Sequence, residues 1–248
     1  MPGAARFFCP GPLLAGTTIS LPSGAARHVQ VLRLQPGNTI TLFCGGGGEF
    51  EASIAEIGRS TVQVAIGRHD CVEREAPRQL HLAIGIPANE RMDWLVEKAT
   101  ELGVASIQPL ISERCVVRLD DERARKKAAH WSSIAVAACE QCGRNRVPEV
   151  HRVAPLPAWS RHLGGNSAGA GAGTRLLLSL RAAAPSLRQT IAGGQLSDGP
   201  VTVLSGPEGG LSGAEEELAI RHGFAPVSLG TRVLRSETAA LVALTLLA

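Results

Sequence analysis

The sequence contains few aromatic residues and no tyrosine, since phenylalanine and tryptophan together make up 3% of its 248 residues. With so few rings, the chain is not expected to bind nucleic acid by stacking bases on a run of aromatic side chains. Lysine is scarce as well, because only three of the 25 basic residues are lysine. Arginine suits phosphate and base-edge contacts through its planar guanidinium, although such a bias can also reflect genome composition.

Long apolar runs are absent. The longest stretch, 239–248, is far shorter than the roughly 18 residues that a membrane-spanning helix needs. The first ten residues lack the charged and apolar regions of a secretory signal. We therefore expect a soluble cytoplasmic protein with reduced cysteines.

The six cysteines are scattered, and the close pair Cys139 and Cys142 has no second pair at the spacing of a zinc site. No metal site is expected, and buried helical cysteines are the simpler interpretation.

The composition is that of a globular protein, with 44% apolar and 19% charged residues. Its length predicts one large domain or two modest ones. The formal net charge of +3 permits a nucleic-acid partner without requiring one.

Short runs separated by turns occupy the segment from Thr17 to Ile66, and they favour a small antiparallel barrel or sheet over helices. We predict strands at 39–43, 50–57 and 61–66, with a four-glycine turn at 45–48. The charged segment 68–78 is the best candidate for a linker.

After Gln79, apolar runs alternate with helical patterns, which is typical of α/β units on a parallel sheet. We predict strands at 80–86, 104–111, 176–180, 201–204 and 227–229. Predicted helices run from an Asn89 cap to Gly103 and from Asp120 to about Gln141. The stretch 164–174, rich in glycine and alanine, is interpreted as a flexible surface insertion.

Two loops near the end of the chain lead from a strand into a helix. The first, 205–210, has the sequence SGPEGG and precedes a capping box formed by Ser212 and Glu215. The second, 230–235, precedes a final helix for which we predict Ser236 as N-cap. The first loop fits neither a dinucleotide-binding motif nor a P-loop, so a structural turn remains an alternative interpretation.

Several ordered motifs resemble the RsmE family of 16S ribosomal RNA uracil-N3 methyltransferases, which belong to the SPOUT class. They are GPEGGLS at 206–212, LG at 229–230 with LRSETA at 234–239, EKATELG at 97–103, EQCGR at 140–144, and RH with VLR at 27–33. The resemblance covers nearly the whole chain. The insertion at 164–173 falls between the motifs and departs from the family pattern only in loop length.

The resemblance implies an α/β fold in two domains: a PUA-like RNA-binding β-barrel at 1–72 and a SPOUT domain with a deep trefoil knot at 73–248. It also implies a homodimer, in which the mostly apolar last helix would be buried against a second copy.

The function that the resemblance implies is S-adenosylmethionine-dependent methylation of uracil N3, at uridine 1498 of 16S ribosomal RNA within the assembled 30S subunit. By family position, we expect the cofactor to be bound by a set of loop residues. They are Leu180, Gly206, Pro207, Glu208, Gly209, Gly210, Leu229, Gly230, Leu234, Arg235, Thr238 and Ala239.

For catalysis, Glu237 is a candidate general base, and Arg235 or Arg232 a candidate cation for the uridine anion. Glu237 could instead only complement the dipole of the last helix. Glu208 could shape the ligand site or pair with an arginine inside the loop.

For contacts with RNA phosphates, we expect basic and polar residues of both domains to contribute. They are Arg6, Arg27, His28, Arg33, Arg144, Asn145 and Arg146. Two alternative functions stay open: a knotted methyltransferase that acts on transfer RNA or on a ribose 2′-oxygen, and a non-catalytic RNA-binding assembly factor.

Overall fold

A computed structural model describes residues 4–88, 90–117, 119–163 and 173–248. The chain divides into two compact units. The first unit consists of the residues up to Glu75 together with Val136–Val147, and the second of Ala76–Ala135 and Pro148–Ala248.

The first unit is built on a five-stranded sheet with the order β1-β3-β4-β5-β2. Its elements are β1 (Arg6–Phe8), β2 (Thr18–Ser20), α1 (Ser23–Val31), β3 (Thr39–Phe43), β4 (Glu49–Ile57) and β5 (Val62–Asp70). The pairing is antiparallel except between β1 and β3, which run parallel. The antiparallel prediction for 17–66 is therefore confirmed for β2, β3, β4 and β5, and β1 precedes the predicted segment.

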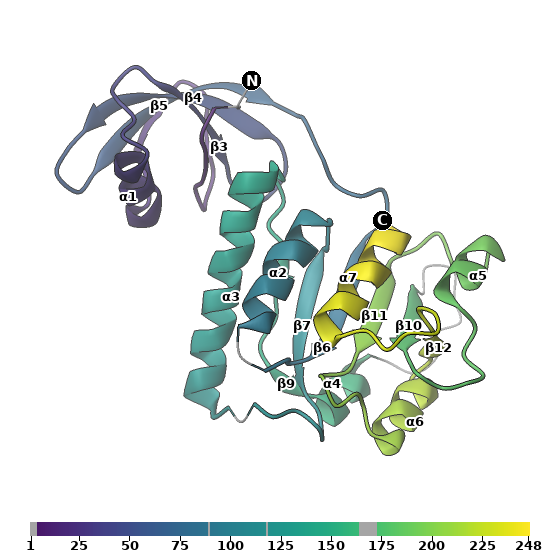
Figure 1. The fold of residues 1–248 in the computed structure, drawn as a ribbon. Coiled ribbons are helices and arrows are strands. Elements are labelled where there is room, and N and C mark those ends of the chain that lie inside the picture. Colours follow the sequence, from purple (N-terminus) through teal and green to yellow (C-terminus); the bar gives the residue numbers. More distant parts are fainter. Residues whose placement is uncertain (1–3, 89, 118, 164–172) are drawn as a thin grey trace. The chain divides into compact units, whose positions relative to one another are not determined.

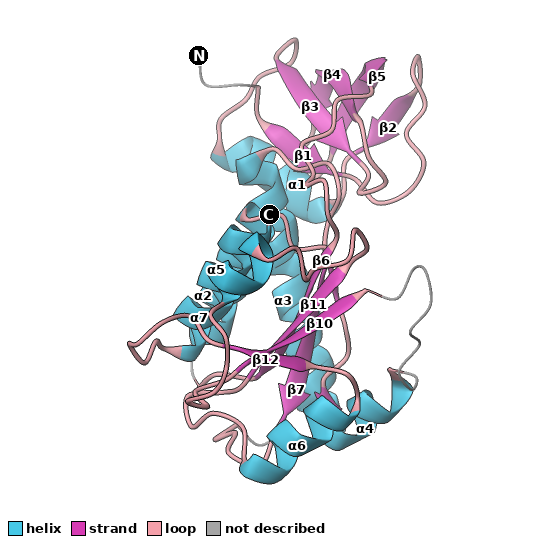
Figure 2. Ribbon diagram, turned by 90° about the vertical axis from the view of Figure 1, so that its right-hand side faces the viewer, coloured by secondary structure: helices cyan, strands magenta, loops and turns pink. Residues whose placement is uncertain are grey.

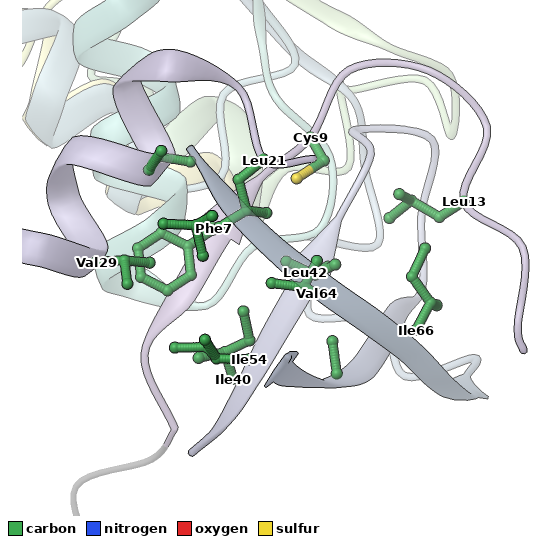
Figure 3. Packing of buried hydrophobic residues seen from close by; sticks show 14 residues of the cluster. Phe7, Cys9, Leu13, Leu21, Val29, Ile40, Leu42, Ile54, Val64 and Ile66 are labelled. Atoms are coloured by element: carbon green, nitrogen blue, oxygen red, sulfur yellow. The ribbon is translucent and has the colours of Figure 1, made fainter. Parts of the chain in front are cut away.

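The core of this unit follows from the alternation of its strands. In β4, Ala52 and Ile54 are buried while Glu51 and Ser53 are exposed, as expected when successive side chains point to opposite faces. Figure 3 shows Ile54 beside Ile40, and Val29 of α1 beside Phe7. One layer of apolar side chains therefore joins the helix to the sheet.

Helix α1 contradicts the expectation of strands alone in this region. It buries only Ala25, Ala26 and Val29, and Pro22 stands at its N-cap without a side-chain hydrogen bond. The helix is only nine residues long and has no polar side chain at its N-cap, so the usual sequence signal for a helix start is missing. The predicted linker is also corrected at its start, because residues 68–70 extend β5.

The second unit has a seven-stranded, entirely parallel sheet with the order β12-β10-β11-β6-β7-β8, in which β9 also pairs with β7. Its strands are β6 (Leu80–Gly85), β7 (Ser106–Ile111), β8 (Glu149–Val150), β9 (Ala154–Pro155), β10 (Thr174–Leu178), β11 (Val201–Ser205) and β12 (Ala225–Val227). The predicted parallel sheet is confirmed, although β12 lies two residues earlier than expected.

Helices cover both faces of this sheet, as Figures 1 and 2 show. They are α2 (Arg91–Glu101), α3 (Asp121–Cys142), α4 (Leu156–His162), α5 (Leu187–Ala192), α6 (Gly213–Arg221) and α7 (Ser236–Leu247). Helix α7 packs against α2, α5, β6 and β11, whereas α4 and α6 pack together on the opposite face. The last seven residues of α3, Val136–Cys142, belong to the first unit.

Two sequence predictions fall partly outside the described residues. Asn89, predicted to cap α2, is not described, and Glu90 is the N-cap residue of the helix. Of the predicted insertion, 164–172 lies outside the described residues. The predicted end of α2 is confirmed, because Gly103 follows Leu102 with a φ of 86°.

Candidate functional site

The loop at 206–210 connects β11 to α6 and folds tightly on itself. A Cβ atom on Gly206 would stand 2.7 Å from the Leu211 nitrogen and 2.8 Å from the Gly210 carbonyl carbon, so no side chain fits there. Gly210 has a φ of 67° and open space around it. The predicted capping box is confirmed, because Ser212 Oγ accepts from Glu215 N and the Glu215 carboxylate accepts from Ser212 N. The loop thus ends at a fixed helix start.

The loop between β12 and α7 contains Gly230, whose φ is 114°. The predicted N-cap is off by one residue: Arg235 is the N-cap and Ser236 is the first helical residue. The Ser236 hydroxyl bonds Glu237 Oε2 at 3.2 Å instead of capping the helix.

A cavity of about 310 Å³ lies between these two loops and the ends of β10 and β11. This is the edge at which ligands bind in open parallel sheets, and the volume falls at the lower end of the range for small-molecule sites. Most of the residues predicted to bind cofactor line it: Leu180, Gly206, Pro207, Glu208, Gly209, Gly210, Leu229, Gly230, Leu234 and Ala239.

A second cavity has a volume of about 1020 Å³. It is lined by the two predicted cofactor residues that do not line the first cavity, Arg235 and Thr238. The candidate catalytic residues are divided between the two cavities. Glu237 lines the second cavity with Arg235, whereas Arg232 lines the first. Because successive residues of 232–239 line different cavities, this segment is a wall that both share.

Residues that sequence analysis missed complete the first cavity. The Arg114 guanidinium, which follows β7, donates to the carbonyl oxygens of Gly209 at 2.9 Å and Leu211 at 3.3 Å. Glu216 of α6 accepts from Ser179 Oγ at 3.2 Å and from Arg181 Nε at 2.6 Å. Only the position of Arg114 and Ser179 after parallel strands could have indicated them.

The contacts of Glu208 show which arginine it pairs with, a question that the sequence left open. Its Oε1 accepts from Arg91 Nη1 at 3.2 Å and from the Ala88 backbone nitrogen at 2.8 Å. The partner arginine therefore comes from the start of α2 and not from within the loop. The same guanidinium reaches the other predicted carboxylate, with Arg91 Nε 4.0 Å from Glu237 Oε1.

Glu237 is 7% exposed, in the first turn of α7. Its carboxylate has the Ser236 hydroxyl on one oxygen and Arg91 near the other. Its position in the first turn agrees with a role in complementing the dipole of α7. Its place on a cavity wall also agrees with a role as general base.

In the first unit, the residues predicted to contact RNA fall into two groups. Arg27, His28 and Arg33 are exposed, on and just after α1, and Arg33 has a φ of 55°. His28 Nδ1 lies 3.8 Å from Glu140 Oε2, and burial raises the pKa of that glutamate, against the opposing effects of the Phe8 backbone nitrogen, His28 and Arg6. The α1 group is accessible to a phosphate backbone.

The other group is held inside the first unit. The Arg144 side chain is 4% exposed and bonds both carboxylate oxygens of Glu75. Asn145 is fully buried; it accepts from Arg6 and donates to the Val72 carbonyl oxygen. Arg6, Arg144 and Asn145 therefore stabilise the fold, and their geometry argues against direct contact with RNA. Arg146 remains half exposed, 3.5 Å from Glu73.

Glu49, whose side chain is 16% exposed, joins Arg6 to Arg74. It accepts from Arg6 and from Arg74. Burial raises the pKa of its carboxyl group, but the hydrogen bonds from Arg74 and Arg6 outweigh burial and lower the pKa to about 2.

Among the described residues, no three His, Cys, Asp or Glu side chains are grouped to hold a metal ion. In the same part of the chain, no helix is long and apolar enough to cross a membrane.

Known families match both units. The model of an RNA methyltransferase domain matches residues 74–248, and that of an RNA methyltransferase PUA domain matches residues 21–67. These two matches place the chain, a parallel α/β domain preceded by a PUA domain, in the class of RNA methyltransferases.

The curated relatives identify the family within this class. Ribosomal RNA small subunit methyltransferase E from Buchnera aphidicola is 34% identical over 92% of this chain and 89% of its own length. The Bacillus subtilis protein of the same name is 30% identical over 92% of this chain and 88% of its own. The chain belongs to the ribosomal RNA small subunit methyltransferase E family, and the resemblance seen in its sequence motifs is confirmed.

Solved structures agree. A protein from Legionella pneumophila, described as a methyltransferase and determined with bound S-adenosylmethionine, matches with a TM-score of 0.90 and 40% identity, over 99% of this chain and 97% of that one. The ribosomal RNA small subunit methyltransferase E of Neisseria gonorrhoeae, also bound to S-adenosylmethionine, matches with a TM-score of 0.88 and 38% identity over the same shares.

Proposed function

We propose that this enzyme transfers the methyl group of S-adenosylmethionine to N3 of uridine 1498 in 16S ribosomal RNA, within the assembled 30S subunit. The observation that carries the proposal is the cavity between 206–210 and 229–239, formed by the residues that the family motifs contribute. Relatives at 38% and 40% identity bind S-adenosylmethionine. The chain would act in the cytoplasm, where its substrate is assembled.

The cavity suits S-adenosylmethionine in its chemistry. Its wall includes glycines at 206, 209, 210 and 230, which leave backbone amides and carbonyls accessible to a ligand. Leu180, Leu229 and Leu234 provide apolar surface for a purine ring, and Arg114 fixes the loop through Gly209. When bound, S-adenosylmethionine supplies a sulfonium methyl group.

The residues of the shared wall would perform the chemistry. Uracil N3 becomes a nucleophile only when its proton is removed, and Glu237 is the carboxylate on this wall that can accept it. The developing negative charge lies on the uracil oxygens, where Arg235 or Arg232 would stabilise it. In this arrangement Arg91, whose Nε lies 4.0 Å from Glu237 Oε1, would help to hold the carboxylate in place.

We infer that the domains divide at residue 72, with the PUA-like barrel at 1–72 binding RNA and 73–248 carrying the catalytic site. Arg27, His28 and Arg33 would contact phosphates through the exposed side of α1, and Arg146 would add a further cation.

We also infer that the catalytic domain contains the trefoil knot of its class. The segment 179–200, which connects β10 to β11, holds the C-terminal part of the chain at Ser228. Ser228 N donates to Pro185 O at 2.8 Å, and Leu187 N donates to Ser228 O at 2.8 Å. Beyond this point α7 packs on α5, α2, β6 and β11. These contacts support a chain end that passes through the 179–200 loop.

A homodimer is part of the proposal. Leu241, Val242 and Leu246 of α7 remain partly exposed, although the helix is apolar on almost every side. A second copy would cover these side chains and could bring its own arginines to the cofactor cavity.

The test is methyl transfer from labelled S-adenosylmethionine to unmodified 30S subunits, with naked 16S RNA and bulk transfer RNA in parallel, followed by nucleoside mass analysis. We expect 3-methyluridine from the 30S sample. If the label enters transfer RNA or a ribose, the substrate assignment is wrong. If no methyl group is transferred and no cofactor binds, the protein is better explained as an assembly factor.

The Glu237→Gln variant tests the base. The amide keeps the shape of the side chain but cannot accept the N3 proton, so we expect turnover to fall by at least about 100-fold with little change in cofactor affinity. Normal turnover would mean that Glu237 is not the base and only complements the dipole of α7.

A further inference from the structure

The second cavity has a composition that the proposed cofactor site does not explain. It is lined by Trp94 and Trp131, by the cations Arg91, Lys127 and Arg235, and by the candidate base Glu237. Its volume of about 1020 Å³ is more than three times that of the first cavity. A cavity of this volume can accept a whole nucleotide unit of a polymer.

Trp94 is the exposed aromatic residue of this wall. It is 46% exposed, whereas its helix neighbours Met92, Leu95 and Val96 are buried. A large indole left half in solvent on an otherwise amphipathic helix offers a flat face to a ligand. Single-stranded bases that leave their stack are bound on such rings.

The helix that carries Trp94 is held firmly. Asp93 accepts a hydrogen bond from Trp131 Nε1 at 2.9 Å, and His130 Nε2 lies 2.8 Å from its other oxygen. Trp131 is 2% exposed, so it serves as an anchor for α2 and leaves the ligand face to Trp94.

The charges of the cavity divide into paired and available groups. Arg91 is engaged by Glu208 and Glu237, and Asp93 by His130 and Trp131. Lys127 and Arg235 are exposed and, within the described ranges, have no ion-pair partner. Glu90, which also lines the cavity, is exposed. Two free cations beside an exposed indole match a nucleotide, which has a flat base and an anionic phosphate.

We propose that the second cavity binds the target pyrimidine nucleotide of the RNA, with the base stacked on Trp94, an adjacent phosphate near Lys127, and Arg235 beside the uracil oxygens. The proposal rests on the proposed function and names the acceptor site of that reaction. It places the nucleotide against the wall 232–239, whose other side lines the cofactor cavity, and within reach of Glu237.

The experiment separates Trp94 from the other indoles of the full-length chain. The protein has three tryptophans, and Trp159 lies next to Phe224 on the opposite side of the sheet from α2. A Trp159→Phe background leaves Trp94 and the buried Trp131 as the fluorophores. We expect a uridine-containing single-stranded oligonucleotide to quench this emission, because stacking brings the base against the Trp94 ring, and Trp94→Phe to abolish the quenching.

Steady-state kinetics on 30S subunits give the second readout. Trp94→Ala should raise KM for RNA about tenfold, as expected for the loss of one stacked base, with S-adenosylmethionine affinity unchanged. Trp94→Phe should restore most of the affinity because it keeps a ring. Lys127→Gln should weaken RNA binding, and Lys126→Gln, on the adjacent exposed position paired with Glu122, should not.

Three results would overturn the proposal. They are an unchanged KM in Trp94→Ala, quenching that persists in Trp94→Phe, and a change in oligomeric state without a change in RNA affinity, which would mean that a second copy covers Trp94. Unchanged cofactor affinity and circular dichroism show that each variant is folded. If the wild-type protein methylates uridine N3 while these variants behave as wild type, the acceptor-site proposal fails and the proposed function stands.

Discussion

The guanidinium of Arg91 donates to the carboxylate of Glu208 across 3.2 Å, although the two residues are 117 positions apart in the chain. This contact ties the start of α2 to the loop at 206–210 and brings a cation near Glu237. The cofactor cavity and the second cavity therefore share one ion-pair network. Substitution of Arg91 is expected to affect ligand binding in both cavities.

A double-mutant cycle tests this link. Arg91→Gln and Glu208→Gln should each weaken S-adenosylmethionine binding several-fold. The loss of binding free energy in the double variant should be smaller than the sum of the losses in the two single variants. Because the side chains are 39% and 29% exposed, we expect a coupling of about 0.5–1 kcal/mol. Isothermal titration calorimetry measures it. Arg123→Gln, at a 75% exposed arginine, is the matched control and should change nothing. Additive effects would show that the ion pair does not hold the loop.

Gly206→Ala should abolish cofactor binding, because the added Cβ would clash with the backbone at Gly210 and Leu211 and the loop would have to open. Gly213→Ala provides the control: a Cβ there meets nothing within 4 Å, at the first residue of α6. This change should leave binding intact and slightly stabilise the helix. Equal cofactor affinity in both variants would contradict the role given to the loop.

Arg144→Gln should destabilise the protein by about 1–3 kcal/mol, because it removes a buried guanidinium that bonds Glu75, whose side chain is 21% exposed. Arg146→Gln, at a half-exposed arginine near Glu73, should cost under about 1 kcal/mol. Thermal unfolding followed by circular dichroism compares them. A well-folded Arg144→Gln protein with weakened RNA binding would restore Arg144 to the RNA contacts.

Acid should weaken the first unit through Glu49. Because its pKa is lowered from 4.5 to about 2, the stability that it contributes is complete above pH 4.5 and is lost as the pH falls toward 2. The expected contribution is about 1–3 kcal/mol, since the side chain is 16% exposed and salt partly screens it. The Glu49→Gln variant should lose stability at neutral pH and show a flatter profile between pH 4.5 and 2 in urea unfolding. A parallel pH profile in both proteins would exclude Glu49 as the titrating group.

The sequence allowed the second unit to be predicted well, because β6, β7, β10 and β11 are each rich in buried apolar residues and α6 carries a full capping box. Prediction from the sequence failed for elements whose structure depends on tertiary contacts. Helix α1 has no polar N-cap to mark its start, and β12 is only three residues long. The trefoil knot and the homodimer came from the resemblance, since no local pattern encodes a threading of the chain or a second copy.

The candidate site shows the same limit. The loops at 206–210 and 229–239 could be found because glycine and capping residues mark them locally. Arg91 and Arg114 could not, because their partners lie more than 90 positions away in the sequence. The sequence predicts RNA contacts for Arg144 and Asn145 because they are basic or polar residues just past a helix end, and only the folded chain brings Glu75 and Arg6 to them.

The cysteines provide a final test of the packing. Burial raises the pKa of the Cys139 thiol to about 12 and that of Cys9 to about 11, so at pH 8 neither forms an appreciable amount of thiolate. Cys71 is exposed on the segment that follows β5. A disulfide reagent at pH 8 should therefore react rapidly with Cys71 in the native protein, and Cys71→Ser should remove this fast phase. Cys9 and Cys139 should react only when the first unit unfolds, so the rate of their modification in urea reports its opening. Fast labelling of Cys139 under native conditions, located by peptide mass analysis, would show that the end of α3 is not packed as described.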